Sequence, residues 1–170
     1  MQSKDAIRYS LTMADEGIRR ALPAIEDAPL TFPTANSGCH PIWVMGHLAL
    51  VEAMTHELLT GEANPIAAWG PLFGPSTTPV ADSEMYPPLT ELKARYAQLR
   101  KGTMEFLDSL SEADLDTRVA NPPAGLEEHF ATYGRALLTL ALHQMSHRAH
   151  LTDAVRQTGR EVLSPFAQAA

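Results

Sequence analysis

Cysteine is almost absent from this chain of 170 residues, which contains Cys39 and no other. A single thiol cannot form an intrachain disulfide, so a disulfide-stabilised secreted fold is excluded and a reducing compartment is favoured. The first twenty residues, MQSKDAIRYSLTMADEGIRR, carry acidic side chains where a secretory signal has an apolar core. We therefore expect a cytoplasmic protein.

Long apolar runs and clusters of basic residues are also missing. No uninterrupted apolar stretch reaches the roughly 20 residues that a membrane-spanning helix needs. The 13 Lys and Arg residues are outnumbered by 20 Asp and Glu residues, and the formal net charge is −7. Nucleic acids and anionic membrane surfaces select clustered positive charge, so we expect neither a nucleic acid nor a membrane as a partner.

Alternation of apolar and polar residues, the pattern of a half-buried strand, is missing as well. Four segments instead repeat apolar residues every three or four positions, as amphipathic helices do. They cover about residues 4–22, 40–60, 90–110 and 132–158. Pro23 ends the first segment and Pro41 suits the first turn of the second. Thr90 is expected to cap the third, and Gly61 and Gly159 to end the second and fourth.

These four helices predict an all-α protein, a four-helix bundle formed by a single domain over residues 1–170. A hydrophobic content of 45% with 19% charged residues is typical of such a globular domain. The connection between the second and third helices, NPIAAWGPLFGPSTTPVADSEMYPP, is long and rich in Pro and Gly. Connections of this length are more often functional than structural filler. Four aromatic residues can line a pocket or belong to the core: Trp43 on the second predicted helix, and Trp69, Phe73 and Tyr86 in this connection.

Histidine is the most informative residue type that the chain does contain. His143, His147 and His150 recur at steps of four and three, and His47 lies within PIWVMGHLALVEAMTHELL. Residues at this spacing share one face of a helix, so a continuous stripe should point into the core. The stripe consists of Ala136, Leu140, His143, His147, His150 and Ala154. Inward-pointing imidazoles at this spacing indicate a metal site between helices.

Neutral imidazole binds zinc, nickel, iron and copper. His143 and His147 can hold one ion from a single helix, and His47 is the best candidate for a third ligand. Three protein ligands leave coordination positions open to water or substrate. Three histidines on one straight helix span about 10 Å. We therefore expect His150 to face the ligands or the substrate rather than to be a fourth ligand.

The alternative is a set of core or interface histidines, each hydrogen-bonded to a neighbour. We expect this role for His40, His56 and His129 taken singly. For His143 with His147 alone, the two interpretations are balanced. The addition of His47 to this pair favours the metal site, because several imidazoles buried together without a bound ion would lose their hydration with no compensating interaction.

Two further patterns are weaker. Cys39 beside His40 resembles a nucleophile next to its base, but adjacent residues rarely point at one another. We expect Cys39 to be a small buried apolar side chain. Glu52 and Glu57 can orient a ligating imidazole, although a solvated helix face is the expected place for both.

The sequence resembles the DinB-like (DinB/YfiT-like) superfamily over most of its length. The segment HPIWVMGHLALVEAMTHELLTGE is similar to the second-helix signature of that family, whose metal histidine matches His47. The segment HQMSHRAHL is similar to the last-helix signature, which places the other two metal histidines at His143 and His147. The stretches PLFGPS, YPPLTEL and LSEADLD are also similar and occur in the same order.

This resemblance implies a bundle of up-down-down-up type with a three-histidine site for a divalent ion, either nickel or zinc, with iron as a further candidate. It also implies a homodimer. Relatives include transferases and isomerases that use a low-molecular-weight thiol such as bacillithiol, mycothiol or glutathione. Two residues depart from the family pattern: His150 replaces the usual glutamine, and Ala149 stands where glycine is common.

Two functions therefore stay open. The first is a metal-dependent hydrolase or thiol S-transferase acting on a small-molecule substrate, in which His150 orients the substrate or transfers a proton. The second is a non-catalytic, dimerising bundle that binds a metal or a small ligand. Open coordination positions beside a cleft would favour the first, and a fourth protein ligand would favour the second.

Overall fold

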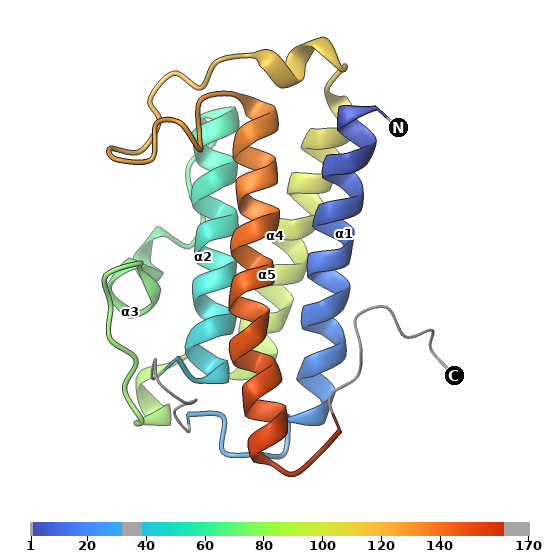
Figure 1. The fold of residues 1–170 in the computed structure, drawn as a ribbon. Helices are drawn as coiled ribbons and strands as arrows, with labels where there is room; N and C mark the ends of the chain where they lie inside the picture. Colours follow the sequence, from blue (N-terminus) through green and yellow to red (C-terminus); the bar gives the residue numbers. More distant parts are fainter. Residues whose placement is uncertain (1, 32–38, 162–170) are drawn as a thin grey trace.

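The computed structural model describes residues 2–31 and 39–161, which form helices and no strand. The long helices are α1 (Ser3–Ala21), α2 (Pro41–Thr60), α4 (Leu89–Ser109) and α5 (Tyr133–Gln157). They lie side by side, and the short helix α3 (Gly70–Phe73) lies outside α2 (Figure 1). The all-α class is confirmed for these residues. The domain expected over residues 1–170 also includes residues 1, 32–38 and 162–170, which lie outside the described ranges.

The ends of the long helices follow the predicted signals closely, with one exception. Gly61 ends α2 in the left-handed conformation, with φ of 77°. The side chain of Thr132 caps α5 by accepting a hydrogen bond from the backbone N–H of Arg135. The cap expected at Thr90 is wrong: Pro88 precedes the first residue of α4, and Thr90 lies inside its first turn.

The segment between α2 and α4 contains three short helical pieces that the sequence did not predict. They are η2 (Ala67–Trp69), α3 and η3 (Ser83–Met85). Phe73, at the end of α3, is fully buried against α2. His40, before α2, contacts the carbonyl oxygen of Val80 through Nε2 at 2.9 Å. This segment is therefore fixed against the first half of α2.

Helix α2 packs against both α4 and α5, and most of its residues are buried. All ten residues from 41 to 50 are buried, so this half of the helix has no solvent-exposed face. A helix that is apolar on every side is typical of the interior of a protein. His47 lies in the middle of this buried stretch and is only 3% exposed.

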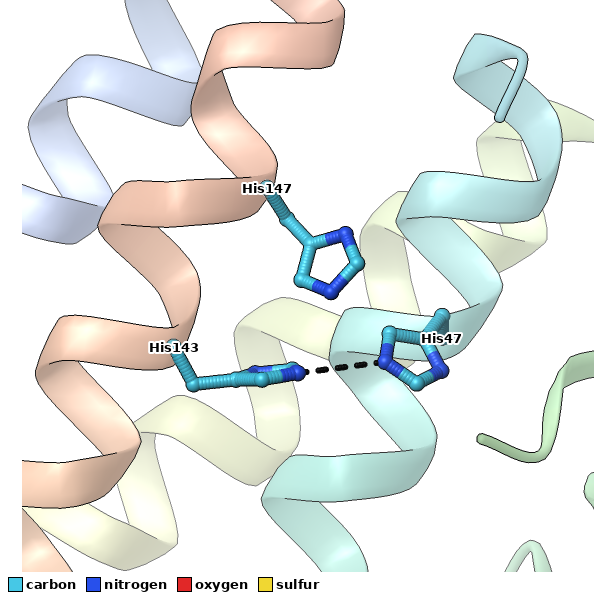
Figure 2. Close-up of side chains that lie close together, drawn as sticks. All are labelled: His47, His143 and His147. Atoms are coloured by element: carbon cyan, nitrogen blue, oxygen red, sulfur yellow. Dashed lines mark hydrogen bonds between the residues drawn. The ribbon is translucent and has the colours of Figure 1, made fainter. Parts of the chain in front are cut away.

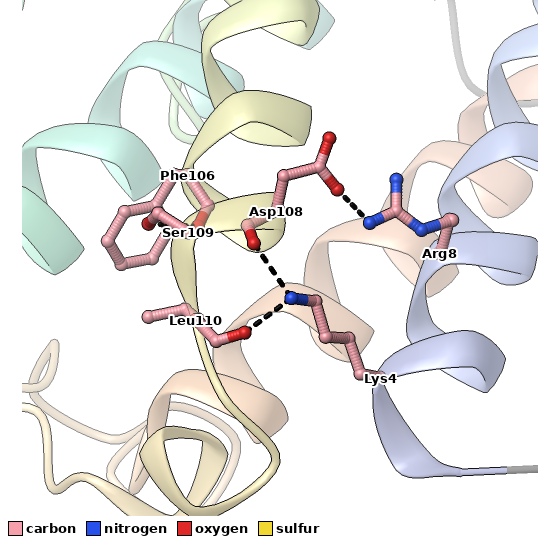
Figure 3. A network of polar contacts seen from close by, with 6 residues as sticks. All are labelled: Lys4, Arg8, Phe106, Asp108, Ser109 and Leu110. Atoms are coloured by element: carbon pink, nitrogen blue, oxygen red, sulfur yellow. Dashed lines mark hydrogen bonds and ion pairs between the residues drawn. The ribbon is translucent and has the colours of Figure 1, made fainter.

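Polar contacts join the start of α1 to the end of α4 (Figure 3). Lys4 donates hydrogen bonds to the carbonyl oxygens of Asp108, at 2.8 Å, and Leu110. Arg8 forms an ion pair with Asp108. The last carbonyl groups of a helix have no partner within it, so Lys4 satisfies groups that would otherwise need water. None of the helices within residues 2–31 and 39–161 combines the length and the hydropathy of a membrane-spanning segment.

Candidate metal centre

Three imidazole rings point toward one another across the contact between α2 and α5 (Figure 2). They belong to His47 on α2 and to His143 and His147 on α5, and one ligand atom of each lies within 4.8 Å of the others. The Nε2 atoms of His47 and His143 are 3.2 Å apart. The ring centres of His47 and His147 are 4.6 Å apart. The convergence that the spacing predicts is present in the structure.

The orientation of His47 is fixed on two sides. Its Nδ1 atom lies 2.7 Å from the carbonyl oxygen of Phe73. A carbonyl oxygen can only accept, so Nδ1 carries the proton and Nε2 presents its lone pair to α5. Trp43, one turn earlier on α2, stacks on the His47 ring at 4.5 Å between ring centres and 11° between planes. Both contacts restrict rotation of the ring.

The position of Phe73 depends on the absence of a side chain on α2. A Cβ atom added to Gly46 would overlap the Phe73 ring, so only glycine lets the ring pack this closely. The residues after Phe73 also contact α2, because the indole N–H of Trp43 donates a hydrogen bond to Thr77 Oγ1 at 3.0 Å. Thr77 in turn donates to the carbonyl oxygen of Gly74 at 2.8 Å. The carbonyl group that orients His47 is thus held by several contacts.

His143 and His147 are half-buried, and both are kept neutral by their surroundings. Burial, together with the proximity of His47, lowers the pKa of His143 from 6.5 to about 4. Burial and the neighbouring imidazoles, His143 first among them, lower the pKa of His147 to about 3. Burial also lowers the pKa of His47, although the Phe73 carbonyl opposes this. Near neutral pH all three rings therefore carry the lone pairs that a metal ion requires.

The three residues fit a divalent metal ion. The Nε2 atom of His143 faces His47, and the buried Nδ1 atoms of His143 and His147 have no hydrogen-bond partner among the described residues. Two nitrogens bound to one tetrahedral zinc ion at about 2.0–2.1 Å are about 3.3 Å apart. This separation is close to the 3.2 Å between the Nε2 atoms of His47 and His143. Three neutral imidazoles suit zinc, nickel, iron and copper alike.

His150 lies beside this group rather than within it. It is half-buried on α5, and its ring centre is 5.6 Å from that of His147. This position agrees with a side chain that faces the ligands. Whether His150 transfers a proton stays a prediction.

The other histidines lie elsewhere. His40 is buried and accepts a hydrogen bond from the backbone N–H of Trp43 through Nδ1. Since both of its nitrogens have other partners, His40 is not placed to act as a base for Cys39. His56 contacts Glu62 at 3.3 Å, as the hydrogen-bonded interpretation expects. His129 is exposed, so of the core or interface position expected for it the structure excludes the core.

Glu52 is also placed differently from the prediction. It is fully buried, whereas Glu57 is exposed on the solvated face expected for both. Glu52 belongs to a buried polar group with Arg100 on α4 and Gln144 on α5. The sequence did contain a signal for this burial, because the residues before Glu52 on α2 are apolar all round the helix. The Phe73 carbonyl had no such signal, since every residue has a backbone carbonyl.

A family model described as the DinB superfamily matches residues 11–151, a range that includes all three histidines of the cluster. A search of curated proteins found no match to this sequence.

Proposed function

The chain belongs to the DinB superfamily, and we propose that it is a metal-binding member in which His47, His143 and His147 hold one divalent ion. The observation that carries this proposal is the convergence of three ring nitrogens from α2 and α5 within 4.8 Å. Nickel and zinc are the proposed ions, with iron as a further candidate, because the ligand set consists of imidazole nitrogen.

We propose the up-down-down-up arrangement of the four long helices and a homodimer. Family membership supports both features, and the side-by-side packing of α1, α2, α4 and α5 supports the bundle. In this arrangement α2 and α5 carry the three ligands. The segment between α2 and α4 orients one of these ligands, His47, through the backbone carbonyl of Phe73.

We propose that the chemistry is that of a metal-dependent hydrolase or thiol S-transferase, with a small molecule as the second substrate. A divalent ion with an open coordination position stabilises the thiolate form of a low-molecular-weight thiol, which is the nucleophilic form. The residues of the chain supply the rest. Trp43 and Phe73 hold His47 in place, and His150 exchanges a proton with the substrate at a ring nitrogen.

The transferase proposal is tested with purified protein loaded with zinc or nickel. Bacillithiol, mycothiol and glutathione are each offered with a panel of electrophiles, and consumption of the thiol is followed. We expect turnover with one thiol and none for His147→Ala. Ester and amide substrates are offered to the same protein to test for hydrolysis. If the protein binds metal but consumes no thiol and hydrolyses no ester or amide, only the non-catalytic metal-binding bundle remains.

A further inference from the structure

A second polar cluster lies in the core of the bundle and contributes no ligand to the proposed metal site. It joins three helices through Glu52 on α2, Arg100 on α4 and Gln144 on α5, which are 0%, 4% and 0% exposed. The side-chain N–H of Gln144 donates to Glu52 Oε2 at 2.5 Å. Arg100 Nη2 donates a hydrogen bond to the side-chain amide oxygen of Gln144, Oε1. The same Nη2 atom lies 3.1 Å from Glu52 Oε2. Gln144 therefore bridges a buried acid and a buried base.

The bridge permits only one placement of the Gln144 amide. Its NH2 group must face the carboxylate and its carbonyl oxygen must face the guanidinium, because the reverse would place donor against donor and acceptor against acceptor. Buried charges without hydrogen-bonded partners are costly, so sliding or rotating α5 past this point is strongly disfavoured. Apolar contacts between the same helices have no such directionality.

Gln144 directly follows His143 in the chain and lies three residues before His147. A contact that fixes the rotation and the height of α5 at residue 144 therefore also fixes both ligating rings of that helix. Its partner on α2, Glu52, lies in the same helix as His47, so the bridge joins the two helices that carry the ligands. Ligands that are already in place bind a metal without the cost of being ordered.

We propose that Gln144 is the positioning residue of the metal site, and that its bridge to Glu52 and Arg100 holds His143 and His147 opposite His47 before the ion binds. The proposal rests on the proposed metal-binding function. In this role Gln144 contacts neither the ion nor the substrate.

The test is a Co²⁺ titration in competition with a chelator, with the visible absorption spectrum of Co²⁺ as a report on its coordination. Gln144→Leu removes both hydrogen bonds of the bridge. Removing a residue that orients metal ligands typically weakens metal binding 10- to 100-fold. We expect a loss in this range and a changed cobalt spectrum. If Gln144→Leu does not fold, Gln144→Asn replaces it. This substitution withdraws the amide group by one methylene, and we expect the same result.

Two further variants separate positioning from general stability. Leu137→Ala removes a fully buried side chain from the same helix, away from the histidines, and should keep wild-type cobalt affinity and spectrum. The exchange Glu52→Gln with Gln144→Glu keeps the net charge and restores an amide–carboxylate pair beside Arg100. This double variant should recover cobalt affinity to within about threefold of wild type, since it retains a bridge.

The outcomes distinguish the inference from the function on which it rests. A wild-type protein that binds no cobalt overturns the proposed function and the inference together. Wild-type affinity and spectrum in the Gln144 variant overturn the inference alone. An equal loss in Leu137→Ala, or a folded exchange variant with no recovery, also overturns it, because either result assigns the loss to something other than the bridge.

Discussion

The backbone carbonyl oxygen of Phe73 lies 2.7 Å from Nδ1 of His47, a residue 26 positions earlier in the chain. This contact determines which nitrogen of the imidazole is protonated and which faces α5. Phe73 can approach α2 closely because the neighbouring helix position is Gly46. The candidate metal site thus depends on a residue that carries no side chain at all.

Gly46→Ala tests this dependence. The added methyl group overlaps the Phe73 ring, so the ring and its carbonyl group must move away from His47. We expect metal affinity to fall about 10- to 100-fold, the usual effect of losing a partner that orients a metal ligand. Isothermal titration with zinc measures the change.

Gly102→Ala is the matched control for this substitution. Gly102 lies within α4, and a Cβ atom there would be at ordinary contact distance, 3.8 Å, from His56. Replacing glycine by alanine inside a helix stabilises it by roughly 0.5–1 kcal/mol, so this variant should be slightly more stable and bind zinc normally. Equal affinity in both variants would show that the Phe73 contact does not matter.

The stability of the metal-free protein should fall as the pH drops below about 6.5. The pKa values of His143 and His147 are about 4 and about 3 in the folded chain, and a free histidine has a pKa near 6.5. Between these values the unfolded chain binds more protons than the folded one, so acid favours unfolding. The contribution of these neutral rings is complete above pH 6.5 and is lost as the pH falls toward about 4 and then 3.

Urea denaturation between pH 7.5 and 4.5 measures this dependence in the presence of a chelator. The variant His143→Gln with His147→Gln lacks both titrating groups and should lose stability less steeply over this range. Identical slopes for the two proteins would contradict the lowered pKa values. Carboxylates titrate in both proteins, so the difference between them isolates the histidines.

Arg100→Met should destabilise the fold strongly. The substitution leaves the carboxylate of Glu52 buried without its positive partner. Breaking a buried ion pair from one side typically costs about 3–5 kcal/mol, and adding Glu52→Leu should recover much of this loss. Urea denaturation gives both values. The control is Arg95→Met on the exposed face of α4, which should change the free energy of unfolding by about 0.5 kcal/mol or less. A loss of similar size for Arg95→Met would contradict the assignment.

The parts of this fold that sequence predicts are those that repeat along a helix. The apolar spacing gave the four long helices to within a few residues, and the steps of four and three placed His143 and His147 on one face. His47 is predicted as their partner because it lies on the apolar seam of its own helix, where an imidazole needs a partner.

The features that the sequence does not predict are those that depend on contacts between residues far apart in the chain. Helix α3 is only four residues long and contains Gly70 and Pro71, so periodicity cannot reveal it. The apolar residues before Glu52 are a signal for its burial, but the two partners that permit this burial, Arg100 and Gln144, lie on α4 and α5. A single sequence does not show which segments meet.

The most direct test of the account is the metal content of purified variants, measured by elemental analysis beside far-ultraviolet circular dichroism. We predict about one ion per chain for the wild type and for the exposed control His129→Ala. Almost none should remain in His47→Ala, His143→Ala and His147→Ala, with helical content unchanged because packing rather than the ion supplies most of the stability. Wild-type metal content in any of these three variants would contradict the assignment of its ligand.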